Sequence, residues 1–263
     1  MKIIVVCLSI LILAIFMAMV GRGGGNFYVP ALIATGMSMN AAATSAQLIL
    51  MTTALVATFV FHTYKAVDWK LALVIDPPTD IMAFIGGYFA HYFVGYHLKF
   101  LFAIFLIVAA FFMLKPVKEH INSGKKQLGY WNRSFGGYDY RVNLWMVIPI
   151  TALVGFFAGM LGISGGSFKI PLMVLACGVP MKVAIGTSSA MVAVTALMGF
   201  AGHSIAGDFN PVWAVPLVCV AALGGLIGGR ISVKREPLHL KKIFAYTTLA
   251  AAGFMIINAF IAK

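Results

Sequence analysis

The residues best suited to chemistry in this chain are two aspartates that interrupt a long apolar stretch. Asp76 and Asp80 flank the sequence Pro-Pro-Thr, with apolar residues before them at 71–75 and after them at 81–85. Carboxylates inside a membrane segment are costly and mark ion or proton pathways, and adjacent prolines break a helix. We therefore expect Asp76 and Asp80 to carry coupling protons. A structural pair with Arg22 or with a hydroxyl group is the alternative role.

Two glycine-rich clusters form a second candidate site. Their sequences are Gly-Arg-Gly-Gly-Gly-Asn at 21–26 and Gly-Ile-Ser-Gly-Gly-Ser at 162–167, and a short apolar segment with a proline follows each of them. Consecutive glycines let backbone N–H groups converge on an anion, and a helix that begins there adds the positive end of its dipole. The pattern predicts an anion site. In the competing interpretation, the small residues only let helices approach closely.

Polar side chains near the two clusters would complete this anion site. Hydroxyl and amide groups can donate hydrogen bonds to an anion, while Arg22 and Lys169 can balance its charge or reach lipid headgroups. The predicted substrate-binding residues are Arg22, Gly23, Gly24, Gly25, Asn26, Thr44, Ser45, Gln47, Ser164, Gly165, Gly166, Ser167, Lys169, Thr187 and Ser188.

A histidine ends each of two long apolar stretches, and we expect both His62 and His203 at the membrane interface.

Residues 162–165 also match the G-x-S-G sequence of rhomboid intramembrane proteases, which makes a serine hydrolase with Ser164 and His203 an alternative. Ser164 aligns with Gly23 in the other cluster, so the duplication already explains the match to the protease sequence. We therefore expect that the protein is not an enzyme. The sequence contains no Cys/His cluster that predicts a metal and no GxxxxGK[ST] motif for ATP, so we expect no cofactor.

Membrane helices must position these residues. The chain has 263 residues, of which 62% are apolar and only 10% charged. A soluble domain is about half apolar and a quarter charged, so the composition excludes a water-soluble enzyme and a nucleic-acid-binding protein in spite of the net charge of +12. The sequence predicts an all-α polytopic membrane protein.

About eight helices of ~20 residues fit into this length. The expected spans cover residues 3–20, 41–61, 70–93, 99–114, 144–161, 183–202, 211–229 and 243–262. Residues 26–36 and 167–178 are too short to cross the ~30 Å apolar core as helices, so we expect a broken or re-entrant segment in each half. The expected domains are a first transmembrane repeat at 1–114, a basic cytoplasmic loop at 115–143, and a second repeat at 144–263.

The two halves of the chain repeat each other. At a shift of 141 positions, Gly21, Gly24, Gly25, Phe27 and Pro30 align with Gly162, Gly165, Gly166, Phe168 and Pro171. Transporters are often built from such repeats, with the substrate site where the broken segments meet. Two four-helix repeats would be parallel, whereas repeats whose short segments also cross would be inverted. Only the inverted arrangement places the basic residues at 230–242 on the same side as the basic loop.

The duplicated motif resembles the TauE/SafE sulfite exporter family, also called the four-TMS toluene sulfonate uptake permease family. The first half carries the motif at Gly21, Gly23, Gly24, Gly25, Pro30, Thr44, Ser45, His62, Asp68 and Trp69, and the second half at Gly162, Gly165, Gly166, Pro171, Thr187, Ser188, His203 and Asp208.

The resemblance implies a secondary transporter of small anions, with sulfite or an organosulfonate as the expected substrate. It also implies a multi-pass protein in the lipid bilayer of the cell (plasma or inner) membrane. Protons are the candidate coupling ion, and a facilitative, channel-like anion pathway is the alternative. Three features depart from the family pattern: Ser164, Arg22 and the sequence at 76–80. They leave the substrate, the direction of transport and the oligomeric state open.

Overall fold

The computed structural model describes residues 2–21, 24–93, 128–163, 165–206 and 211–234, together with single residues and short runs between 97 and 111 and between 246 and 257. All structural statements below concern these residues. The expected spans at 99–114 and 243–262 therefore lie largely outside the described part of the chain. The same holds for Arg22, Gly23 and Ser164, and for the side chains of Asn26 and Ser167.

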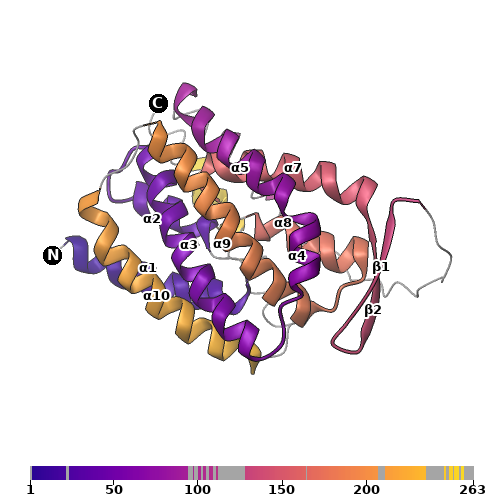
Figure 1. The fold of residues 1–263 in the computed structure, drawn as a ribbon. Helices are drawn as coiled ribbons and strands as arrows, with labels where there is room; N and C mark the ends of the chain where they lie inside the picture. Colours follow the sequence, from indigo (N-terminus) through magenta and orange to yellow (C-terminus); the bar gives the residue numbers. More distant parts are fainter. Residues whose placement is uncertain are drawn as a thin grey trace.

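Helices make up most of the described structure (Figure 1). The first half contains α1 (Lys2–Met19), α2 (Gly25–Ile33), α3 (Met39–Thr63), α4 (Trp69–Ile75), α5 (Pro77–Phe89) and the 3₁₀ turn η1 (Ala90–Tyr92). The second half contains α7 (Leu144–Leu161), α8 (Gly166–Pro171), the π-helical stretch η2 (Leu172–Ala176), α9 (Met181–Ile205) and α10 (Pro211–Val233).

The described helices confirm a multi-pass membrane protein. Four of them are long and apolar enough to cross a membrane, namely α3, α7, α9 and residues 214–233 of α10. Helix α1 contributes a shorter apolar stretch at Ile4–Met19. The short segments expected at 26–36 and 167–178 correspond to α2 and to α8 with η2. Eight spans and two homologous repeats stay predictions.

A β-hairpin stands where the sequence analysis expects only a basic loop. Strands β1 (Tyr130–Phe135) and β2 (Tyr138–Asn143) pair antiparallel, and Gly136 and Gly137 form the turn between them. Both glycines have positive φ, 62° and 81°, as a two-residue hairpin turn of type I′ requires. The hairpin projects beyond the ends of the helices (Figure 1).

The span expected at 70–93 is broken at Asp76, as the two prolines predict. Pro77 and Pro78 lack the N–H groups that would bond the carbonyls of Leu73 and Val74, so α4 ends at Ile75 and α5 starts anew at Pro77. The chain still keeps a helical course, because the N–H of Asp80 donates to the carbonyl of Asp76 at 3.1 Å.

Helices α3 and α9 lie side by side and antiparallel in the middle of the molecule (Figure 1). Gln47 near the start of α3 lies beside Gly199 near the end of α9, and the Ser189 hydroxyl donates to the carbonyl of Ala54 at 3.2 Å. Helix α5 packs on α7 and α9 of the second half, and α10 packs on α1 and α3 of the first half. Corresponding helices with opposite directions are what inverted repeats would produce.

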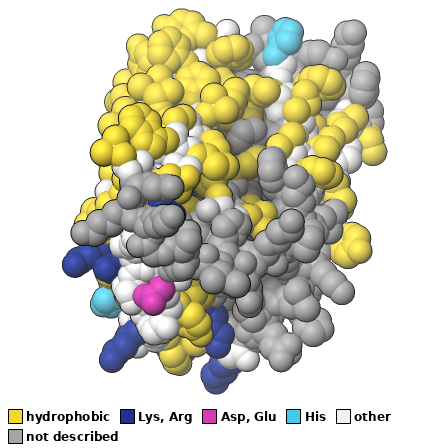
Figure 2. Space-filling view, turned by 90° about the vertical axis from the view of Figure 1, so that its right-hand side faces the viewer, with side chains coloured by type: hydrophobic (Ala, Val, Ile, Leu, Met, Phe, Trp, Pro, Cys, Tyr) yellow, Lys and Arg dark blue, Asp and Glu magenta, His cyan; other side chains and the backbone are white. Residues whose placement is uncertain are grey.

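The described charged side chains form two groups. The larger group lies at the hairpin end of the molecule and contains Lys65, Asp68, Lys70, Arg133, Asp139, Arg141, Lys182, Arg230 and Lys234. In Figure 2 most visible Lys and Arg side chains lie in the lower part of the face, while the described side chains of its upper part are mostly hydrophobic. The second group is Asp76, Asp80 and Lys169, which lie inside the helical bundle.

Candidate functional site

A buried lysine connects the two aspartates that the sequence analysis singles out. The Lys169 ammonium forms an ion pair with Asp76 and donates a hydrogen bond to Thr195 Oγ1 at 2.8 Å. Thr195 Oγ1 in turn lies 2.8 Å from Asp80 Oδ1 and 2.9 Å from the carbonyl oxygen of Met191, so its single proton can go to either oxygen. The side chains of Lys169 and Asp76 are only 1% and 7% exposed.

Two breaks in regular helix structure and one continuous helix bring this cluster together. Asp76 lies at the junction of α4 and α5, where the prolines interrupt the helix. Lys169 belongs to the six-residue helix α8, directly after the second glycine cluster. A Cβ atom on Gly165 would come within 3.2 Å of Lys169 Cε, so the lysine stem lies over a glycine and would have to shift to admit a larger residue. Thr195 comes from the long helix α9.

The repeat predicted from the sequence pairs this cluster with uncharged residues of the first half. Tyr28 aligns with Lys169 at a shift of 141 positions, and Thr53 aligns with Thr195 at a shift of 142. The Tyr28 hydroxyl lies 3.4 Å from Thr53 Oγ1, and the tyrosine is fully buried. Helix α10 provides no carboxylate in the region that corresponds to 76–80. Of these two corresponding clusters, only the one around Lys169 therefore carries charge.

The two glycine clusters meet in the middle of the molecule. A Cβ atom on Gly25 would come within 2.7 Å of both the Gly162 carbonyl oxygen and Ile163 Cα. Gly21 and Gly162 both have φ of +69°, which glycine adopts without strain. A Cβ on Gly21 would meet Ile185 of α9 at 2.5 Å, and one on Gly162 would meet Ala43 of α3 at the same distance. At these positions the glycines let backbones approach closely, and the predicted anion site at the clusters stays a prediction.

The remaining predicted binding residues are spread over several contacts. Thr44 Oγ1 donates to the carbonyl of Asn40 at 2.9 Å. Gln47 Nε2 donates to the carbonyl of Ala158 at 3.1 Å, near the end of α7. Ser45 and Ser188 are buried, as are Gly24, Gly25, Gly165 and Gly166. Thr187 lies at the hairpin end and accepts a hydrogen bond there. The structure thus places Lys169, Asp76 and Asp80 together but not the whole predicted set.

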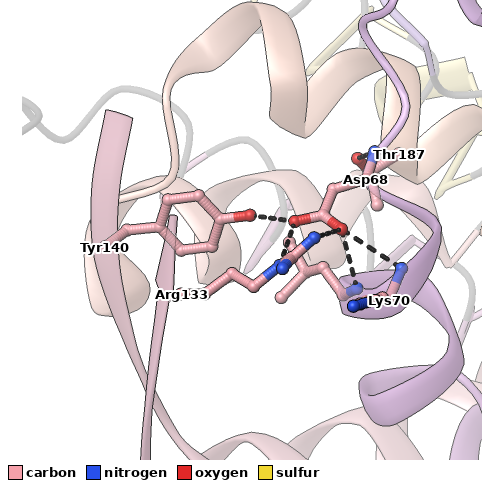
Figure 3. Close-up of polar contacts among 6 residues, drawn as sticks. Asp68, Lys70, Arg133, Tyr140 and Thr187 are labelled. Atoms are coloured by element: carbon pink, nitrogen blue, oxygen red, sulfur yellow. Dashed lines mark hydrogen bonds and ion pairs between the residues drawn. The ribbon is translucent and has the colours of Figure 1, made fainter. Parts of the chain in front are cut away.

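A second polar cluster forms around Asp68 at the hairpin end (Figure 3). Arg133 donates to both carboxylate oxygens of Asp68 at 2.9 Å, and the Tyr140 hydroxyl donates to Oδ2. Asp68 also caps α4, because its Oδ1 accepts from the N–H groups of Lys70 and Leu71 at 3.1 and 3.2 Å. Its own N–H donates to Thr187 Oγ1 at 2.9 Å.

The pKa values of this hairpin-end cluster favour the charged pair. Burial favours a neutral Asp68, but the hydrogen bonds from Arg133, Tyr140 and the Leu71 N–H outweigh burial and hold the pKa of Asp68 below its ordinary value of 3.8. The hydrogen bond to Asp68 raises the pKa of Arg133. Burial and the contact with Asp68 raise the pKa of Tyr140, so its hydroxyl stays a donor.

The two predicted interfacial histidines differ. His62 is exposed and its Nδ1 accepts from Trp69 Nε1 at 3.1 Å, as expected for the end of a span. The prediction is wrong for His203, which is fully buried with Nε2 at 2.9 Å from the carbonyl oxygen of Gly159. The close packing of α9 against α7 and α5 around small residues takes this histidine out of contact with the membrane surface. Ser164, its partner in the hydrolase alternative, lies outside the described residues.

The described part of the chain holds no group of three or more His, Cys, Asp or Glu side chains placed to bind a metal. Its polar chemistry rests on a buried ammonium, two carboxylates and a hydroxyl. Such a set can exchange a proton and can pair with an anion.

Comparison with known proteins gives one family and several relatives. The family model described as "Sulfite exporter TauE/SafE" matches residues 6–255. The chain is 30% identical to "Probable membrane transporter protein YunE" of Bacillus subtilis over 230 residues, which cover 83% of this chain and 84% of the relative. It is 24% identical to "Probable membrane transporter protein MJ0441" of Methanocaldococcus jannaschii over 264 aligned positions, with 94% and 92% covered. No solved structure matches the chain.

Proposed function

Because the chain belongs to the sulfite exporter TauE/SafE family, whose members are membrane transporters, we propose that it is a secondary transporter of a small anion, either sulfite or an organosulfonate. We further propose that Lys169 binds the anion and that Asp76 and Asp80 couple its movement to protons. The ion pair between Lys169 and Asp76, buried among apolar helices, is the observation that carries this proposal.

The charges of the cluster explain why a proton and an anion would bind together. With Lys169, Asp76 and Asp80 all ionised, the cluster has a net charge of −1 and the ammonium already has a carboxylate partner. An anion that enters this site meets net repulsion in a medium where charges are weakly screened. A proton on Asp76 removes the competing carboxylate and leaves Lys169 available. Protonation and anion binding therefore favour each other, which is the thermodynamic requirement for coupling.

Thr195 links Lys169 to Asp80 through one hydroxyl group. It accepts a hydrogen bond from Lys169 and can donate to Asp80, so a change at either group alters the bonds available to the other. When Lys169 turns toward an anion, the Thr195 hydroxyl loses its donor. We assign Thr195 the role of positioning Lys169 between its carboxylate partner and the substrate.

The glycine clusters would supply the rest of the anion site. They meet at Gly25 and Gly162, and α2 and α8 begin beside this meeting point. In this proposal, backbone N–H groups of these segments and the polar residues predicted from the sequence hold the anion near Lys169. The antiparallel arrangement of α3 and α9 suits alternating access, in which one bundle rocks against the other. The basic hairpin end would face the cytoplasm of a cell membrane.

Anion-dependent stabilisation of the purified protein in detergent tests this proposal. The panel contains sulfite, sulfate, thiosulfate, sulfoacetate, acetate and chloride, each measured at two pH values by thermal unfolding. A ligand at 100 times its Kd adds about 2.7 kcal/mol of stability. We expect one sulfur oxyanion or sulfonate to stabilise the protein, and Lys169→Met to abolish the effect.

Lys182→Met is the matched control, because Lys182 is an exposed lysine at the start of α9. Stabilisation that survives Lys169→Met, or no response to any anion, would contradict the proposed site.

A further inference from the structure

Helix α4 connects the buried charge cluster to the hairpin. Asp68 caps its first turn and Asp76 caps its last, so the two carboxylates stand eight positions apart on one helix. On α9, Thr187 and Thr195 are also eight positions apart. Thr187 accepts a hydrogen bond from the N–H of Asp68, and Thr195 accepts one from Lys169 in the buried cluster. A helix of seven residues is a rod about 10 Å long. Movement at one end of α4 is therefore transmitted to the other end.

The hairpin holds the Asp68 end of this rod from outside. Arg133 and Tyr140 stand directly opposite each other in the β1–β2 register, and both side chains reach the Asp68 carboxylate (Figure 3). Trp131 and Phe135 lie on the same face of the hairpin, with ring centres 5.8 and 6.0 Å from the Arg133 guanidinium carbon. A bidentate Arg–carboxylate pair has strict geometry, so the contact fixes both the position and the direction of the start of α4.

Discontinuities in the backbone on both sides of α4 set it apart as a short unit. The loop before it contains Lys65, which has a positive φ of 55°. The break at Pro77 follows its last turn. Between these two points, the described polar anchors of α4 are the Asp68 contacts at the hairpin end and the Asp76–Lys169 ion pair inside the bundle.

We propose that the β1–β2 hairpin is a latch for the transport site. In this scheme the contact of Arg133 and Tyr140 with Asp68 holds α4 against α9 and closes the site on the hairpin side. Release of Asp68 lets α4 swing away, which opens that side and draws Asp76 from Lys169. The proposal rests on the proposed function, because it takes Lys169 and Asp76 as the site to which access is controlled.

Cys177 is a native reporter for this movement. It is 2% exposed and belongs to the same apolar cluster as Leu71 and Ile75 of α4 and Val142 of the hairpin. If α4 and the hairpin separate, water and small reagents reach the Cys177 thiol. The other two cysteines, Cys7 and Cys219, lie on different helices and are replaced by serine in the test protein.

The test measures the rate at which a membrane-impermeant maleimide labels Cys177 in the purified full-length protein in detergent, without added anion. We expect slow labelling in the parent and labelling at least about tenfold faster after Arg133→Gln, since a hydrogen-bonded charge pair of this kind keeps the closed state favoured by about that factor or more. Arg133→Lys keeps the charge but loses the two-point contact of the guanidinium with the carboxylate, so we expect an intermediate rate of Cys177 labelling. Asp68→Asn is a second way to open the latch, because it removes the charge that pairs with Arg133. Asparagine still caps α4, so the helix keeps its first turn.

Arg141→Gln is the matched control within the hairpin. Arg141 lies on the opposite face of the two strands, with its guanidinium 4.0 Å from the Tyr130 ring centre, and carries the same charge as Arg133. Labelling of the Arg141→Gln protein should match the parent. Equal rates for the parent, Arg133→Gln and Asp68→Asn would overturn the latch, as would equal acceleration by Arg133→Gln and Arg141→Gln.

The labelling rates separate this inference from the proposed function. They do not depend on which substrate is carried, because no anion is present. Faster labelling in the latch variants of a protein that responds to no anion would keep the hairpin's hold on α4 and reject the proposed transport site. A protein that binds a sulfur anion through Lys169 but labels at the same rate in all variants would keep the site and reject the latch.

Discussion

Removal of one partner from the Lys169–Asp76 pair should destabilise the protein far more than removal of both. Lys169 and Asp76 have side chains that are 1% and 7% exposed, and a buried charge left without its partner costs about 3–5 kcal/mol. In Asp76→Asn the ammonium keeps its 2.8 Å bond to Thr195, so we expect a loss at the lower end, about 3 kcal/mol. Lys169→Met leaves the buried Asp76 carboxylate without its ammonium partner, and we expect a similar loss.

The double variant Asp76→Asn/Lys169→Met removes both charges and keeps the volumes. Replacement of a buried ion pair by neutral groups of similar size is often close to neutral, so we expect a total loss of about 0–2 kcal/mol instead of the sum of about 6 kcal/mol. Equilibrium unfolding in SDS mixed micelles measures all four proteins. A double variant that loses the full sum would show that the two groups do not interact, and would refute the ion pair as the organising contact of the site.

Three further predictions concern single positions around the two clusters. Thr195→Val should weaken anion-dependent stabilisation and Thr195→Ser should retain it, because only a hydroxyl can accept the hydrogen bond from Lys169. Thermal unfolding at increasing anion concentration compares the two variants. Gly165→Val should lower anion affinity while the protein still folds, because the new side chain displaces the Lys169 stem. Anion titration measures the affinity, and gel filtration shows whether the variant is folded. Asp68→Asn should be less stable than the parent at neutral pH. The pKa of Asp68 is held below 3.8 in the folded protein, so the pair's contribution is present above that pH and is lost as the pH falls through the lowered pKa. Unfolding at pH 7 and pH 3 should therefore show a difference that shrinks in acid.

The sequence predicts the local features of this fold well. Apolar runs predict α3, α7, α9 and α10 to within a few residues, and two prolines predict the break between α4 and α5. The two carboxylates stand out because charge is rare in such a stretch. The partner of Asp76 is a different matter. Lys169 is 93 positions away, and no periodicity or spacing connects them, so Arg22 and a hydroxyl were equally reasonable partners.

The sequence does not predict two features of the structure, for identifiable reasons. The basic charges at 115–143 predict a loop, but two strand-like runs with alternating side chains flank Gly136-Gly137, and this pattern is typical of a hairpin with a type I′ turn. Thr195 does not stand out in the sequence, because a threonine inside an apolar helix is a common residue and its role depends on what α5 and α8 place beside it. The sequence signal for Thr195 is its alignment with Thr53, which stands beside Tyr28 in the first half.

Proton-coupled flux of the anion is the most direct test of the central claim. Proteoliposomes that contain the protein are given a pH difference across the membrane, and uptake of sulfite or sulfoacetate is followed together with proton movement. We predict saturable uptake driven by the pH difference in the parent. We predict no such uptake in Asp76→Asn, although that variant still binds the anion in thermal unfolding. Equal pH-driven flux with and without the Asp76 carboxylate would contradict proton coupling at this site.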